Sequence, residues 1–232
     1  MQAVVLSEAF TWTGTVWRMV EAQHTASTMK IVDDDEEQDL LETLLEGSKP
    51  VQPANAMALD YLLATPFRYS PSRGGSRFRA ITDPGVFYGA ESVRTSSAEL
   101  GYWRWRFLKD AVDLEMLDPV AHTAFSAEVS TQLVDLRRSP FSANADQWLH
   151  PTDYSATQAF ARAAREAKLG GIQYQSVRDP NPAWCVALLT PQAFVKPKPN
   201  PLMQNWWLAV HRDSVSWRRE NESMTFSFTA WS

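Results

Sequence analysis

The 232-residue chain has the length of one large domain. Hydrophobic residues make up 44% and charged residues 21%, with 10 Trp and 11 Phe, which is a globular composition and excludes a disordered chain. A net charge of −5 disfavours a nonspecific nucleic-acid binder, and the single cysteine, Cys185, excludes an intramolecular disulfide. No apolar run approaches the ~18 residues of a membrane span, and residues 1–14 contain no Lys or Arg. These features predict a cytoplasmic protein without a membrane segment.

The sequence contains no pattern for a metal or a nucleotide loop. None of the histidines lies at ligand spacing from another, so we expect no metal. They are His24, His122, His150 and His211. A phosphate-binding GxxxxGK[ST] loop and a GxGxxG motif are also missing. Any ligand must therefore be held by other side chains.

The first expected elements are a strand over residues 15–20 and an acidic helix within residues 31–48. The acidic segment has eight acids and no base. Asp33 or Asp34 can cap its start and Gly47 can end it. Four leucines at helical spacing should anchor this helix to the body, namely Leu40, Leu41, Leu44 and Leu45. Its acids form either a docking face for a basic partner or an ordinary solvated face.

A short helix is expected over residues 56–64, stopped by Thr65-Pro66, with an extended segment over residues 67–69. Residues 76–82 and 86–90 then read as a hairpin around an Asp-Pro-Gly turn. A helix rich in Trp, Tyr and Leu follows at residues 94–109.

The second half predicts a long strand over residues 122–136, an amphipathic helix over residues 154–169, and strands over residues 172–177 and 183–189. Two or three short strands complete the chain between residues 203 and 230. Strands and helices mix without strict alternation, which predicts an α+β fold with a largely antiparallel sheet. We expect one domain over residues 1–232, with a helical insertion at about 31–64.

Arginines are concentrated in one part of this acidic chain. Residues 68–106 contain three acids, Asp83, Glu91 and Glu99, and seven arginines: Arg68, Arg73, Arg77, Arg79, Arg94, Arg104 and Arg106. Arginine binds phosphate oxygens with a planar, permanently charged fork. On the expected strand Arg77 and Arg79 share a face. The cluster indicates either an anion site or surface arginines beside a hairpin.

Spaced motifs surround these arginines. Arg77 in Ser-Arg-Phe-Arg precedes Tyr88 in Val-Phe-Tyr-Gly by eleven residues, and Tyr88 precedes Glu99 in Ser-Ala-Glu-Leu by eleven. Ser176 follows a helix and a double glycine, and Arg18 lies in the first strand. This series, over roughly residues 15–195, resembles the RES-domain family, whose fold resembles that of the ADP-ribosyltransferases.

The resemblance implies roles for these residues. Glu99, Tyr88 and Ser176 are expected at the catalytic centre, and Arg18, Arg77, Tyr88 and Ser176 are expected to bind NAD+. Arg18 is the preferred early arginine of the pattern. The long acidic stretch between Arg18 and Arg77 departs from compact members, so Arg68 in Phe-Arg-Tyr-Ser-Pro remains the alternative.

The resemblance also implies a function. RES proteins are toxins of type II toxin–antitoxin systems that cleave NAD+ at the nicotinamide–ribose bond. We expect mono-ADP-ribosyl transfer to a protein, with NAD+ glycohydrolysis or phosphorolysis as the alternative. The expected partner is an antitoxin with a helix-turn-helix DNA-binding domain whose other end blocks the NAD+ pocket. Neither nucleic acid nor a membrane is expected as a direct partner.

The chemistry agrees with these implied roles. Cleavage of the nicotinamide–ribose bond builds positive charge on the ribose, which the Glu99 carboxylate can stabilise. Tyr88 can stack on nicotinamide, while Ser176 can hydrogen-bond the carboxamide or the ribose. Arg178 is either a second phosphate contact or a surface ion pair. Other classes remain open: an RNA-directed or non-catalytic toxin, and a binding module with a partner face of tryptophans. Those tryptophans, read most simply as core, are Trp103, Trp105, Trp184, Trp206, Trp207 and Trp217.

Overall fold

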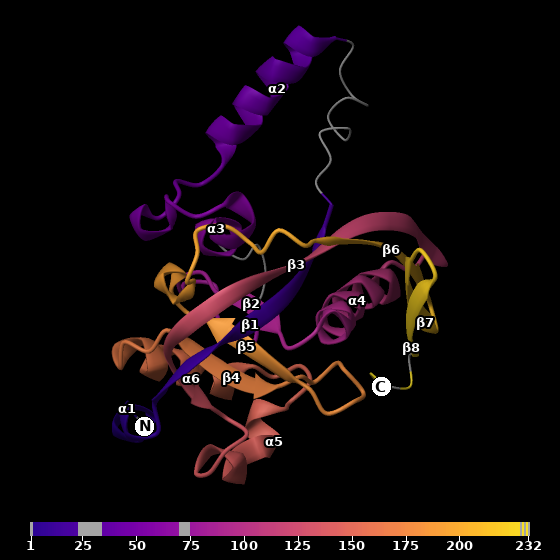
Figure 1. Cartoon of the computed structure of the whole chain (residues 1–232). Coiled ribbons are helices and arrows are strands. Elements are labelled where there is room, and N and C mark those ends of the chain that lie inside the picture. The colour runs from indigo at the N-terminus through magenta and orange to yellow at the C-terminus, as the bar shows by residue number, and fades with distance from the viewer. Residues whose placement is uncertain (1, 23–33, 70–74, 228, 230, 232) are drawn as a thin grey trace.

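A computed structural model describes residues 2–22, 34–69, 75–227, 229 and 231 (Figure 1). The candidate cap Asp33, the histidine His24 and the arginine Arg73 lie outside these residues. The architecture is α+β, as predicted, with one eight-stranded sheet and helices packed against it.

The strands follow the alternating or continuous apolar patterns of the sequence. They are β1 (Phe10–Glu21), β2 (Phe87–Ala90), β3 (Met116–Asp135), β4 (Gly171–Gln175), β5 (Trp184–Leu188), β6 (Gln204–His211), β7 (Ser214–Arg219) and β8 (Glu222–Ser227). The short strands expected near the C-terminus are thus confirmed. The long strand β3 begins six residues earlier than expected, because a register shift between Leu117 and Val120 lets the strand accommodate Pro119.

The strands form the order β1-β2-β5-β4-β3-β6-β7-β8, and β1 also pairs with β3. Of the pairs among these strands, β3–β4 is parallel and the others are antiparallel. The β1–β3 pairing closes β1, β2, β5, β4 and β3 into a ring, while β6–β8 extend from β3 as a three-stranded wing (Figure 1).

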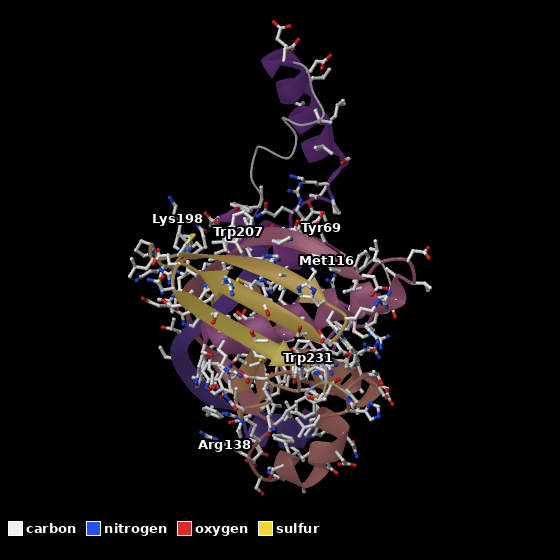
Figure 2. All side chains as sticks on the ribbon, turned by 90° about the vertical axis from the view of Figure 1, so that its right-hand side faces the viewer. Tyr69, Met116, Arg138, Lys198, Trp207 and Trp231 are labelled. Atoms are coloured by element: carbon white, nitrogen blue, oxygen red, sulfur yellow. The ribbon has the colours of Figure 1, made fainter. Side chains whose placement is uncertain are left out.

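The helices lie at different places around the sheet (Figure 1). They are α1 (Gln2–Ser7), α2 (Asp35–Ser48), α3 (Tyr61–Arg68), α4 (Val93–Asp110), α5 (Ala145–Trp148) and α6 (Ser155–Glu166). Helix α4 contacts both the ring strand β1 and the wing strands β6 and β7, and the C-terminal strands face the viewer in front of it in Figure 2. Helix α1, which the sequence did not predict, packs on α6.

Three apolar clusters hold these layers together. One joins α6 to β4 and β5 around Phe160 and Ile172. A second joins α4 to the wing around Trp105 and Trp217. The third lies against β1, β3 and α3 around Phe125. Helix α4 is therefore fixed from the wing side by aromatic packing, which leaves its other face available to a site.

Residues 76–82 are not a strand, so the expected hairpin is wrong. Ser76 N and Arg79 O form a hydrogen bond of 2.7 Å, and Arg79 N bonds Ser76 O at 3.1 Å, which closes a tight turn. The Asp83 carboxylate accepts from Ala80 N at 2.8 Å. Because local partners occupy these backbone groups, they are not free to form a strand ladder, and β2 pairs with β1 and β5 instead.

Helix α3 also differs from the expected boundaries. It begins at Tyr61 after Asp60, whose side chain accepts from Leu62 N, and it continues through Pro66 to Arg68. Residues 67 and 68, expected to be extended, are helical. Leu63 and Phe67 are buried on the same side of the helix, and this packing outweighs the hydrogen bond that Pro66 removes.

Helix α2 forms where the sequence predicts it, and Asp34 Oδ1 accepts from Glu37 N at 2.8 Å as its cap. The expected anchoring to the body is wrong for three of its leucines: Leu40, Leu44 and Leu45 are exposed by 60%, 62% and 44%. Figures 1 and 2 both show α2 projecting away from the sheet. Helical spacing identifies an apolar face but not the surface that covers it, which explains this error.

Candidate active site

A cavity of about 370 Å³ lies between α4 and the ring strands β1, β2, β4 and β5. Its described lining contains three arginines and one carboxylate, so it carries positive charge inside an acidic protein. The charged lining residues are Arg18, Arg77, Arg178 and Glu99. Such a lining favours a dianionic ligand.

Glu99 enters the cavity from the second turn of α4. The helix begins after Ser92, whose side chain accepts from Thr95 N at 3.1 Å and so fixes the first turn. Glu99 Oε1 accepts from Ser176 Oγ at 2.6 Å, and Cys185 Sγ lies 3.9 Å from the same oxygen. Among the described residues Oε2 has no hydrogen-bond partner, so it is the oxygen that a ligand can approach.

Ser176 lies behind Glu99 and not in the cavity lining. Its hydroxyl donates to Glu99 and accepts from the backbone N–H groups of Arg178 at 3.2 Å and Asp179 at 3.1 Å. A hydroxyl has one donor and two acceptor sites, so this bonding is complete. The geometry gives Ser176 a contact with Glu99 in place of the direct substrate contact that the sequence suggested.

Arg18 lines the cavity from β1. Its Nη1 donates to Tyr88 O at 2.9 Å, and its guanidinium lies 4.9 Å from the ring centroid of Phe87. Its Nε is buried without a hydrogen-bond partner among the described residues. Burial lowers the pKa of Arg18 to about 10, so the group is charged at neutral pH. A half-buried cation whose buried Nε–H is unused is suited to an anionic ligand.

Tyr88 lines the cavity from β2, and its hydroxyl is held by the turn at residues 76–79. The hydroxyl bonds Ser76 Oγ at 2.8 Å and accepts from Phe78 N at 2.9 Å. Burial raises the pKa of Tyr88, so the phenol is neutral. Gly75, with φ of +75°, completes this wall, and a Cβ there would lie 2.3 Å from Arg79 O. The turn therefore requires glycine beside the cavity.

Arg77 is fixed by the protein at one end of its fork. Its Nη1 donates to Trp148 O at 2.9 Å and His150 O at 3.0 Å, and its guanidinium lies 4.7 Å from the ring centroid of Tyr154. Arg178, which the sequence left open, is 3% exposed and lies 3.4 Å from the ring centroid of Tyr102. Arg178 thus lines the cavity and is not a surface ion pair.

The remaining described arginines of the cluster do not join this site. Arg79 donates to Asp83 O, and three others form ion pairs, namely Arg94 with Asp179, Arg104 with Glu21, and Arg106 with Asp110. The turn at residues 76–79 also separates Arg77 from Arg79, which were expected on one face. Arg68, the alternative early arginine, lies outside the lining, and its Nε donates to Pro50 O at 2.6 Å.

Sequence reasoning missed several lining residues, namely Trp103, Tyr154, Tyr174 and Cys185. Trp103 had a detectable signal, because it follows Glu99 by four residues and so shares its helix face. The others come from separate elements and carry no spacing signal. Within the described residues, no group of three or more His, Cys, Asp or Glu could hold a metal ion. No described helix is both long and apolar enough to cross a membrane.

Comparison with known proteins gives a family and a weak structural similarity. The model of the RES domain matches residues 53–211. A chain of the M. tuberculosis MbcT-MbcA toxin–antitoxin complex is similar at 12% identity, with 96% of this chain and 89% of that chain covered and a TM-score of 0.46. No curated protein matches. The matched range includes Arg68, Arg77, Tyr88, Glu99 and Ser176 and begins after Arg18.

The family match covers more than half of the residues and contains the carboxylate and two of the three arginines of the cavity. The chain therefore belongs to the RES domain family.

Proposed function

We propose that this protein is a toxin of a toxin–antitoxin system that binds NAD+ in the cavity and cleaves its nicotinamide–ribose bond. The observation that carries the proposal is Glu99, a carboxylate that lies among three arginines in the cavity lining. The pyrophosphate of NAD+ has two negative charges, which Arg18, Arg77 and Arg178 complement. Membership of the RES domain family supports the same substrate.

The reaction needs charge stabilisation at the ribose. As the bond to nicotinamide breaks, its electrons leave with the neutral nicotinamide ring and positive charge develops on the ribose. The free oxygen of Glu99 then stabilises this charge and accepts a hydrogen bond from the ribose 2′-hydroxyl. Because the leaving group departs neutral, the reaction requires no general acid. A cavity whose described lining residues include no histidine can therefore catalyse it.

The other lining groups orient the substrate. The Tyr88 ring stacks on nicotinamide, since its hydroxyl is already bonded to Ser76 and Phe78. The arginines hold the pyrophosphate through forked hydrogen bonds. Ser176 acts through Glu99, whose carboxylate it fixes at 2.6 Å.

The acceptor of ADP-ribose in this proposal is a protein side chain, which makes the reaction a mono-ADP-ribosyl transfer. Water or phosphate as acceptor would make the protein a glycohydrolase or phosphorylase that depletes NAD+. The cognate antitoxin, with its helix-turn-helix domain, would silence the toxin in the cytosol by covering the cavity. An RNA-directed toxin has less support, because five of the seven clustered arginines are bonded to protein acceptors outside the cavity.

The test uses NAD+ labelled in the adenylate part, incubated with the purified protein and a cell lysate. Label on a lysate protein indicates transfer, free ADP-ribose indicates hydrolysis, and ADP-ribose 1″-phosphate indicates phosphorolysis. A parallel incubation with total RNA tests the RNA-directed alternative. Intact NAD+ after incubation with folded protein and lysate would refute the proposed function.

A further inference from the structure

The loop after β4 packs against α4 and contacts one face of the helix at three positions. Thr95, Glu99 and Tyr102 occupy positions i, i+4 and i+7 of the helix and therefore share one face. Each of them contacts one residue of the loop, and these residues are Asp179, Ser176 and Arg178, respectively. The carboxylate of the cavity is the middle contact of the three.

Asp179 joins the loop to the start of α4. Its side chain is 2% exposed, and its Oδ2 accepts from Thr95 Oγ1 at 3.0 Å. Its Oδ1 lies 3.4 Å from Arg94 Nε and accepts from Asn181 N at 3.1 Å. A carboxylate this buried is costly unless its oxygens are paired, and here both are.

The backbone of Asp179 is connected to the catalytic carboxylate. Its N–H donates to Ser176 Oγ at 3.1 Å, and Ser176 Oγ donates to Glu99 Oε1 at 2.6 Å. One residue thus holds α4 through its side chain and Ser176 through its backbone. Since Ser176 has no donor left, its orientation toward Glu99 depends on the N–H groups that it accepts from.

We propose that Asp179 is a positioning residue: it locks the loop of residues 176–181 against α4 and so holds the Glu99 carboxylate in its reactive orientation. This inference rests on the proposed function for its kinetic consequence. Asp179 does not line the cavity, so its effect on the substrate is indirect. We expect the neighbouring Arg178 to stay in place, because its guanidinium lies over the Tyr102 ring. Loss of the lock should slow the chemical step and leave NAD+ binding largely intact.

The first experiment compares nicotinamide release by the wild type, Asp179→Ala and Asp179→Asn. Asp179→Ala should lower kcat by roughly 10- to 100-fold, the effect of a small misplacement of a reacting group, with KM within about threefold. Asp179→Asn retains an oxygen for Thr95 and should recover part of kcat. A kcat of Asp179→Ala within about twofold of the wild type would overturn the proposal.

A double-mutant cycle separates positioning from a general loss of stability. In a Glu99→Gln background, Asp179→Ala should change the residual rate by less than about twofold, because the group that it positions is already gone. Asp135→Ala is the matched control: its side chain is 1% exposed and paired with Arg137, but it lies outside the cavity lining. This control should lower the unfolding midpoint and leave kcat unchanged. Equal multiplicative effects of Asp179→Ala in both backgrounds would overturn the proposal.

A structural measurement works without turnover. With ¹³C-labelled glutamate, the Glu99 side-chain carboxyl signal is identified by its loss in Glu99→Gln. It should shift in Asp179→Ala and stay in place in Asp135→Ala. An unmoved signal in Asp179→Ala refutes the positioning role. If the Glu99 signal shifts in Asp179→Ala but the wild type does not cleave NAD+, the proposed function is refuted and the positioning role of Asp179 is supported.

Discussion

Replacement of Arg18 by methionine should weaken NAD+ binding while leaving the free protein about as stable as before. Burial lowers the pKa of Arg18 from its ordinary value to about 10, which corresponds to roughly 3 kcal/mol against the charged form. At neutral pH the guanidinium is protonated, so this cost is present in the folded protein. Methionine fills a similar volume without the charge.

Two favourable interactions of the Arg18 guanidinium offset most of this burial cost in the wild type. The bond to Tyr88 O contributes about 1.5–3 kcal/mol, and the interaction with the Phe87 ring about 0.5–1 kcal/mol. The free energy of unfolding should therefore change by no more than about 1 kcal/mol in Arg18→Met. The NAD+ dissociation constant should rise roughly 10- to 150-fold, since a charge-assisted phosphate contact of about 1.5–3 kcal/mol is removed.

The assay is urea unfolding together with calorimetric NAD+ titration, both in a Glu99→Gln background so that NAD+ stays intact. Arg68→Met is the control, because Arg68 lies outside the cavity and should leave NAD+ affinity unchanged. A loss of more than about 3 kcal/mol of stability in Arg18→Met, with unchanged NAD+ affinity, would refute this prediction. Loss of binding in Arg68→Met but not in Arg18→Met would reverse the assignment of the early arginine.

Three further predictions concern the cavity and α2. Arg77→Ala should weaken NAD+ binding roughly 10-fold or more and destabilise the fold by about 1–3 kcal/mol, because the carbonyls of Trp148 and His150 lose their donor. Arg77→Lys should restore part of both, as measured by NAD+ titration and urea unfolding of the two variants in parallel. NAD+ affinity measured across pH should be flat from about pH 6 to 9 and fall as pH rises through about 10, where Arg18 loses its proton; a loss near neutral pH would contradict this. Replacement of Asp34, Glu37 and Glu42 by serine should leave NAD+ cleavage unchanged and reduce the salt dependence of antitoxin association. Loss of NAD+ cleavage in this variant would instead place α2 at the active site.

Much of the fold could be predicted because its signals are local. The amphipathic pattern of α6, the aromatic run of α4 and the apolar strands β4 and β5 each depend on neighbouring residues. The turn within residues 76–82 could not be predicted, because it is held in part by the Tyr88 hydroxyl, which comes from a separate strand and bonds Ser76 and Phe78. The packing that carries α3 through Pro66 is equally non-local.

The candidate site could be predicted in part for a related reason. Spacing placed Glu99, Tyr88 and Arg77 in one series, and the structure brings all three to one cavity. Sequence spacing could not predict that Ser176 lies behind Glu99, because its position depends on two backbone N–H groups of the following loop. Sequence spacing also could not predict that Arg178 lines the cavity, because its guanidinium is covered by the ring of Tyr102 on another element.

The most direct measurement is release of labelled nicotinamide from NAD+ by the wild type and by Glu99→Gln, with NAD+ affinity determined for both. Glutamine keeps the shape of the side chain and can still accept from Ser176, but it lacks the charge. We predict release by the wild type and a rate lower by on the order of 10²–10³ in Glu99→Gln, with affinity changed far less. Equal rates in the two proteins, or no release by folded wild type, would contradict the account.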